Sequence, residues 1–195
     1  NANLSRFNED FATVKYSDSG AEQWRAQHDS PGNSDDFAMA ATTDAAGNTY
    51  ITGYTTTIGT TEDYVTAKFN AAGERLWAAT YNGPSDGHDN ATAIATDRDG
   101  NVYITGFSDG DTTGNDYATI KYDANGTEMW VQRYDGSGSS DDEPVAIAVD
   151  SIGAVYLTGT SLGATTGNDF VTIKYDTDGN EMWVSRYDNP AFGSN

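Results

Sequence analysis

The sequence repeats itself with a period of 53 residues. One passage occurs four times, and each copy has a tryptophan in the same register, at Trp24, Trp77, Trp130 and Trp183. A second passage lies between these copies and occurs three times, at 35–53, 88–106 and 141–159. A fixed period near 50 residues is typical of a stacked or circular array in which one supersecondary unit recurs. The chain is therefore predicted to be one array of repeats.

Each full repeat contains four short segments that are typical of β-strands. Examples are 102–106, 116–122, 128–134 and, as the first strand of the next repeat, 145–149. An Asx residue and a glycine occupy the short turns, as in DRDGN (97–101) and DANG (123–126). The Asx side chain opens a tight turn and glycine supplies a positive φ, so neighbouring strands are expected to be antiparallel. The sequence predicts an all-β chain.

Four antiparallel strands per repeat, with an alanine-rich first strand and a polar crossing loop after the fourth, describe a β-propeller blade. The residues that carry this pattern resemble the SBBP, or bacterial β-propeller, repeat: GNVYITG (100–106), DYATIKY (116–122), the G-x-x-x-W spacing of Gly126 and Trp130, and AIAVD (146–150). The resemblance covers nearly all of residues 10–190. It implies the architecture, with the small first strand innermost and the tryptophan strand outermost, and says little about activity.

The third and fourth strands occur four times, whereas the first and second occur three times. This gives 14 strands, or about three and a half blades, divided into an outer half-blade (1–35) and blades at 36–88, 89–141 and 142–195. A propeller needs closure to protect its edges, and one inner hairpin is missing. The chain is therefore expected to be a piece of a longer array, a distorted four-bladed ring, or a subunit whose neighbours cover its open edges. An interface between copies that does not close on itself would build a filament or tube.

The composition excludes several partners and chemistries. A formal net charge of −20 would repel nucleic acid and anionic membranes. The absence of cysteine excludes disulfides and thiolate sites. No apolar run is long enough to insert in a membrane, and the first residues carry no signal peptide, so an extracellular or cell-surface location would require a processed chain or a fragment.

Three aspartates begin the inner strands at equivalent positions: Asp36, Asp89 and Asp142. If they circle the propeller axis at one end, their carboxylates could bind calcium, which prefers oxygen ligands. The alternative is that each carboxylate caps backbone amides in the crossing turn. The acidic turns at 97–101 and 176–180 lack the glutamate that a calcium loop requires, so turn formation explains them.

All four lysines occupy one repeat position, and counting across the hairpin turn places three of them opposite glutamates. The predicted cross-strand ion pairs are Lys15–Glu22, Lys121–Glu128 and Lys174–Glu181. These pairs assign the lysines a structural role.

No catalytic motif is present, and neither His28 nor His88 lies in a context typical of a hydrolytic triad. We therefore expect a non-enzymatic extracellular structural or surface protein that associates with itself through incomplete blade edges and requires no cofactor. The alternative is a binding module for a glycan, a peptide or a cation, or for contact with a cell surface, that uses loops at one end of the propeller. An enzyme that uses the axial carboxylates is a third interpretation.

Overall fold

The computed structural model describes residues 9–31, 34–56, 61–137, 141–163 and 167–188. Within them, 14 strands form four antiparallel sheets and there is no helix, which confirms the predicted all-β class and strand number. None of these residues therefore forms a helix that could cross a membrane. The two ends of the predicted domain, 1–8 and 189–195, lie outside the described residues.

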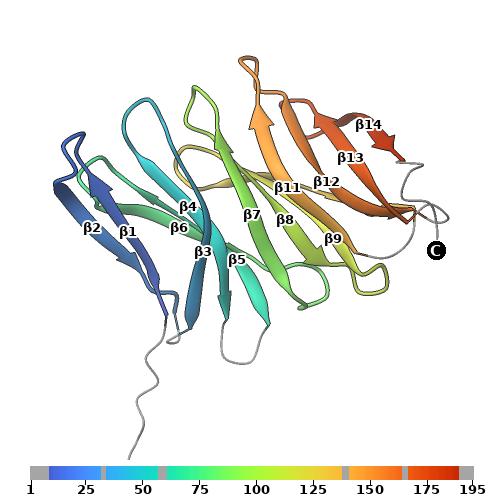
Figure 1. Cartoon of the computed structure of the whole chain (residues 1–195), viewed down its shortest axis with the longest axis horizontal. Helices are drawn as coiled ribbons and strands as arrows, with labels where there is room; N and C mark the ends of the chain where they lie inside the picture. Colours follow the sequence, from blue (N-terminus) through green and yellow to red (C-terminus); the bar gives the residue numbers. More distant parts are fainter. Residues whose placement is uncertain (1–8, 32–33, 57–60, 138–140, 164–166, 189–195) are drawn as a thin grey trace, which may run out of the picture.

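The four sheets follow one another along the chain (Figure 1). The half-blade consists of β1 (Phe11–Tyr16) and β2 (Glu22–His28). Blade 1 consists of β3 (Asp35–Thr43), β4 (Thr49–Thr56), β5 (Glu62–Phe69) and β6 (Arg75–Tyr81). Blade 2 consists of β7 (Asp89–Thr96), β8 (Val102–Asp109), β9 (Asn115–Tyr122) and β10 (Glu128–Tyr134). Blade 3 consists of β11 (Asp142–Val149), β12 (Val155–Gly163), β13 (Gly167–Tyr175) and β14 (Glu181–Tyr187).

Side chains of the turns set the hairpins, as the sequence predicts. The carboxylate of Asp97 accepts hydrogen bonds from the backbone amides of Asp99 and Asn101, both at 2.9 Å. Gly100 then adopts a φ of 80°, which a residue with a side chain rarely does. The same arrangement recurs at Asp44, Asn70, Asp123, Asp150 and Asp176.

A bulge shifts the register of the hairpin between the third and fourth strands. Glu128 lies opposite Tyr122, but Trp130 lies opposite Lys121, so the fourth strand holds one extra residue. The same shift places Trp24 opposite Lys15 and Trp183 opposite Lys174.

The predicted ion pairs Lys15–Glu22, Lys121–Glu128 and Lys174–Glu181 are therefore wrong. No ion pair among the described residues joins a lysine to a carboxylate. Lys121 instead places its ammonium 5.2 Å from the centroid of the Tyr103 ring, a cation–π contact. Counting residues across the hairpin turn gave the wrong partners because the turn sequence does not indicate the bulge.

The hydrophobic core lies between successive blades. Tyr50 and Tyr64 of blade 1 pack against Val102, Ile104 and Ile120 of blade 2. The equivalent residues Tyr103 and Tyr117 of blade 2 pack on blade 3, and Phe11 of the half-blade packs on blade 1. The alanine-rich strands β3, β7 and β11 lie side by side (Figure 1). Each blade is thus apolar on both faces and depends on a neighbour to bury them.

Candidate functional site

We call the contact between successive blades a joint, and its central feature is a tryptophan that packs on a glycine turn. The ring of Trp77 in blade 1 lies against Gly126 of blade 2, so closely that a Cβ on this glycine would be 2.7 Å from the ring. Trp77 Nε1 donates a hydrogen bond to the carbonyl of Ala124 at 3.2 Å. Lys68 Nζ donates to the same carbonyl at 2.9 Å.

The same joint occurs three times. Trp24 packs on Gly73 and donates to the Ala71 carbonyl at 3.0 Å. Trp130 packs on Gly179, and Trp130 Nε1 and Lys121 Nζ both donate to the carbonyl of Thr177. The half-blade therefore stacks on blade 1 as a complete blade would, although only two of its strands are among the described residues.

The face of blade 3 that points away from blade 2, which we call the tail face, carries the same side chains without a partner blade among the described residues. Phe170 is 59 % exposed, whereas Tyr64 and Tyr117 at the equivalent position are 1 % exposed. Trp183 is 42 % exposed and packs edge-on against Tyr156 of its own blade, with ring centroids 6.3 Å apart. The tail face thus presents the tryptophan half of a joint.

The opposite end of the array, which we call the head face, is the outer face of the half-blade. It carries Ala12, Val14 and Tyr16. Tyr16 is 58 % exposed, although its equivalents Phe69 and Tyr122 are buried. The turn glycine of this unit, Gly20, has a φ of 79° like the others, but no atom lies within 4 Å of where its Cβ would be. The head face thus presents the glycine half of a joint, with no tryptophan on it.

A hollow of about 300 Å³ lies beside the head face. It is lined by Ala12, Thr13 and Val14 of β1, by residues 38–41 of β3, and by Ile51. In the complete blades, the second strand pairs with the third strand on this side, whereas β1 pairs only with β2 among the described strands. Among the described residues no inner hairpin pairs with β1, and the hollow lies beside this open strand edge.

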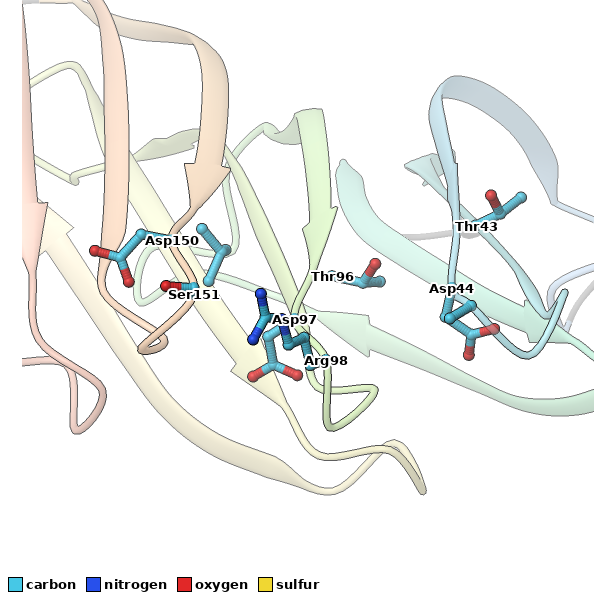
Figure 2. Close-up of a pocket in the computed structure, with 9 residues that line it drawn as sticks. Thr43, Asp44, Thr96, Asp97, Arg98, Asp150 and Ser151 are labelled. Carbon is cyan, nitrogen blue, oxygen red and sulfur yellow. The ribbon is translucent and has the colours of Figure 1, made fainter.

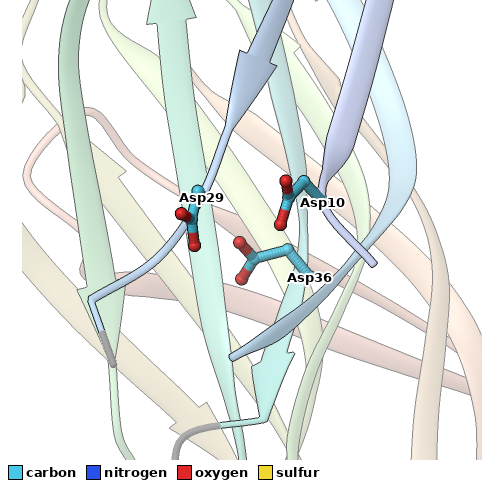
Figure 3. A group of neighbouring side chains, drawn as sticks. All are labelled: Asp10, Asp29 and Asp36. Carbon is cyan, nitrogen blue, oxygen red and sulfur yellow. The ribbon is translucent and has the colours of Figure 1, made fainter. Parts of the chain in front are cut away.

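Aspartates gather at two of the joints. Asp10, Asp29 and Asp36 place one carboxylate oxygen each within 4.8 Å of one another, and so do Asp116, Asp135 and Asp142. Figure 3 shows the carboxylate of Asp36 between those of Asp10 and Asp29. In each group the residues come from the start of the third strand, the loop after the fourth strand, and the first strand of the next blade. The middle joint has Asn82 in the loop position and therefore only two carboxylates.

The three aspartates predicted to share one axial site do not meet. Asp36 and Asp142 belong to separate groups, and Asp89 belongs to neither. Each caps the crossing loop, which is the alternative that the sequence left open. Their Oδ2 atoms accept hydrogen bonds from the backbone amides of Ser30, Gly83 and Gly136, at 2.7, 2.6 and 2.5 Å respectively.

The second oxygen of each capping carboxylate lies buried without a hydrogen-bond partner. This holds for Asp36, Asp89 and Asp142, and also for one oxygen of Asp116. Burial raises the pKa of Asp142 above 3.8, although the hydrogen bond from the Gly136 amide lowers it, and the Asp116 charge raises it further. Burial and the charges of Asp116 and Asp142 also raise the pKa of Asp135. These joints concentrate negative charge that the described residues neutralise only in part.

A second hollow, of about 350 Å³, lies where the three inner hairpins turn (Figure 2). Equivalent residues from three blades line it, including Thr43, Thr96 and Val149. The carboxylate of Asp44 accepts hydrogen bonds from Asn48 and Tyr50 of its own hairpin. Its oxygens therefore stabilise the turn. Arg98 adds a basic side chain to the hollow.

The histidines also have local partners. Arg75 Nη1 donates to His28 Nδ1 at 2.7 Å, and burial lowers the pKa of His28. His88 Nδ1 lies 3.1 Å from Glu62 Oε2, and the His88 side chain is mostly exposed.

Comparison with known proteins agrees with this repeat architecture. Residues 79–118 match the SBBP β-propeller repeat. None of the curated proteins matches the chain. A solved structure described as a crystal structure of the eukaryotic initiation factor superposes with a TM-score of 0.51 at 10 % identity, over 94 % of this chain. This chain spans 44 % of the length of that one, and the similarity concerns the fold alone.

Several residues of the aspartate groups were missed from the sequence. Asp10 and Asp116 begin the passage that occurs four times. Asp29 and Asp135 both follow the fourth strand at the same repeat position, and this register was the available signal. Pairing them with Asp36 and Asp142 required knowing that the crossing loop folds back onto the start of the third strand.

Proposed function

We propose that the protein is a non-enzymatic, extracellular structural element whose copies associate through the incomplete ends of the blade array. The single observation that carries this proposal is the exposure of two end faces that are buried at every joint within the chain. Phe170 and Trp183 at the tail face and Tyr16 at the head face are exposed, while their equivalents within the array pack on a neighbouring blade.

The position of exposed aromatic side chains on the tail face supports association. Contiguous apolar patches on a soluble protein commonly mark an interaction site, whereas scattered apolar residues do not. The tail face gathers Phe170, Trp183 and Tyr187, which are all at least 42 % exposed, on two neighbouring strands. A scaffold made of stacked blades needs no catalytic group.

Sedimentation velocity over a wide concentration range, with electron microscopy of the same samples, tests this function. We expect concentration-dependent oligomers, and rings or filaments in the images. High salt should favour them, because a formal net charge of −20 repels copies at low ionic strength. A protein that remains monomeric at high concentration and high salt would overturn the proposal.

The carboxylate groups favour a second function, calcium binding through the loops at one end of the blades. Two observations support it: three carboxylates converge at each of two joints, and the buried oxygens of Asp36 and Asp142 lack hydrogen-bond partners. Calcium takes six to eight oxygen ligands, so water or backbone carbonyls would complete the shell. Bound calcium would connect two blades. Its positive charge would offset the repulsion between the carboxylates.

Thermal unfolding in calcium and in a chelator tests this second function. Calcium at about 100 times its Kd should raise Tm by roughly 10 to 20 °C, because each of the two sites binds it only in the folded state and adds about 2.7 kcal/mol. The variant Asp142→Asn should lose about half of this increase. Asp89→Asn at the two-carboxylate joint is the matched control and should retain it. Equal Tm values in calcium and chelator would exclude calcium binding.

A further inference from the structure

We propose that one copy seats Trp183 on the Gly20 turn of a second copy, so that the tail face and the head face form a joint of the kind seen three times within the chain. This proposal rests on the proposed function, because it names the partner and the contact through which the copies associate. It follows from the fact that each end face holds one half of a contact whose complete form is repeated inside the molecule.

The repeat register assigns the atoms of this joint. Within the chain, each tryptophan donates its Nε1 hydrogen to the carbonyl that precedes the turn glycine by two residues. In the first turn this position is Asp18, which is exposed. Trp183 Nε1 of one copy would therefore donate to the Asp18 carbonyl of the next. The Lys174 ammonium, already placed 4.9 Å from the Tyr156 ring centroid, would donate to the same carbonyl.

The space needed for the tryptophan is present at Gly20. At Gly73, Gly126 and Gly179, the ring of the preceding tryptophan lies 2.7 to 2.8 Å from the place that a Cβ would take, so only glycine allows the contact. At Gly20 that space is open. The positive φ of Gly20 is shared with the other three turns, so the backbone already has the shape that receives the ring.

Apolar contacts would extend around this centre. Trp77 and Trp130 also contact the last aromatic residue of the third strand in the next blade, Tyr122 and Tyr175, with centroids 6.1 and 6.2 Å apart. The equivalent residue on the head face is Tyr16, which is exposed. Contact with Trp183 would bury both rings. The described part of the half-blade consists of β1 and β2, so these strands would reproduce the outer half of an internal joint and bind more weakly than a whole blade.

This contact is heterologous, since it joins two different surfaces of identical chains. Such a contact produces a closed ring if the rotation between copies closes, and a filament if it does not. In both cases each copy uses its head face once and its tail face once. That property gives a test that does not depend on the final shape of the assembly.

The test uses two variants that each block one face. Trp183→Ala removes the tail tryptophan, and Gly20→Asn fills the head turn with a residue that tolerates a positive φ. Both sites are exposed, so each variant should fold, which circular dichroism and the melting transition will check. Met182→Ala is the matched control, because Met182 adjoins Trp183 and is as exposed as its equivalent Met129 inside the array.

We expect each blocked variant alone to sediment as a monomer under conditions in which the wild type and Met182→Ala assemble. An equimolar mixture of the two blocked variants should form dimers and nothing larger, because only one intact tail and one intact head remain. If both variants assemble like the wild type, or if their mixture stays monomeric, this joint is wrong while self-association itself stands. A wild type that never assembles overturns both proposals.

Discussion

Blade 2 and blade 3 have closely similar sequences but different surroundings. Trp130 of blade 2 packs on Gly179 of the next blade and is half-buried, whereas Trp183 of blade 3 has no such partner among the described residues and is 42 % exposed. Tyr117 and Phe170 differ in the same way. The comparison shows that a blade of this array is not a self-sufficient unit, because its own four strands leave one apolar face to be covered by the following blade.

This difference separates the stability that comes from the strands of one blade from the stability that the joint adds. Residues at one repeat position have the same strand, the same register and nearly the same neighbours within the blade. What changes from blade 2 to blade 3 is the presence of the next turn. Matched substitutions in the two blades therefore measure the joint alone, provided that the protein is kept dilute enough to be monomeric.

The largest difference is expected for the tryptophans. Trp130→Ala removes a ring packed between two blades and its hydrogen bond to Thr177, and should lower the free energy of unfolding by roughly 3 kcal/mol. Trp183→Ala removes a ring that contacts only its own blade and should cost less than about 1 kcal/mol. Urea unfolding of the monomers measures both. Equal losses would show that the tryptophan stabilises its own hairpin and not the joint.

The turn glycines should give the next largest difference. Gly126→Ala and Gly20→Ala both place a side chain at a φ near 80°, which costs roughly 1 kcal/mol. At Gly126 the new Cβ also meets the Trp77 ring, and this overpacking should add about 2 kcal/mol. Thermal unfolding of the pair isolates the steric part. Losses of the same size would mean that the Trp77 ring moves away without cost.

The lysines test the polar part of the joint. Lys121 is buried and donates to the Thr177 carbonyl, whereas Lys174 has the same cation–π contact but no carbonyl from a following blade within the described residues. Lys121→Met should cost about 1 kcal/mol more than Lys174→Met, the size of a net hydrogen bond. Urea unfolding at moderate salt measures the difference. A larger loss for Lys174 would contradict the proposed role of the joint carbonyl.

The strands and turns were predictable from the sequence because they depend on local chemistry. The Asx side chain in DRDGN, with the glycine that follows it, selects one turn geometry whatever surrounds it. Strand number followed from counting such turns. The position of Trp130 opposite Lys121 could not be counted, because the bulge adds a residue to the fourth strand. The same bulge occurs in blade 3, where Trp183 has no partner blade among the described residues, so it belongs to the hairpin and not to the joint.

The candidate sites were predictable only in part. The register of Asp36, Asp89 and Asp142 was visible, and their capping role was one of the two predicted alternatives. Their actual carboxylate neighbours come from the preceding blade, so they depend on how two blades stack. The unequal exposure of Trp130 and Trp183 is invisible in the sequence, since the two residues lie in almost identical strands.

The smallest effects on stability are expected for substitutions of aspartates. One of these aspartates, Asp142, lies at a joint, and the other, Asp44, lies in a turn. Burial raises the pKa of Asp142 above 3.8 at a joint. Asp44 lies in a turn, where burial raises its pKa but hydrogen bonds from Asn48, Tyr50 and Ala46 outweigh this and leave it lowered. Asp142 therefore contributes stability that is fully present below pH 3.8 and is lost as the pH rises through its folded pKa. Asp44 contributes stability above pH 3.8 that is lost as the pH falls through its folded pKa.

Asp142→Asn in a chelator should consequently raise Tm slightly at neutral pH and remove part of the gain in stability on mild acidification. Asp44→Asn should lower Tm at neutral pH and leave that gain intact. Carboxyl-carbon NMR titration of the wild type supplies the two pKa directions directly. A pKa of Asp142 below 3.8 in the metal-free protein would mean that the joint neutralises its carboxylate by itself. The buried oxygens at the joints would then need no cation, and the charge there would reflect capping of the crossing loop alone.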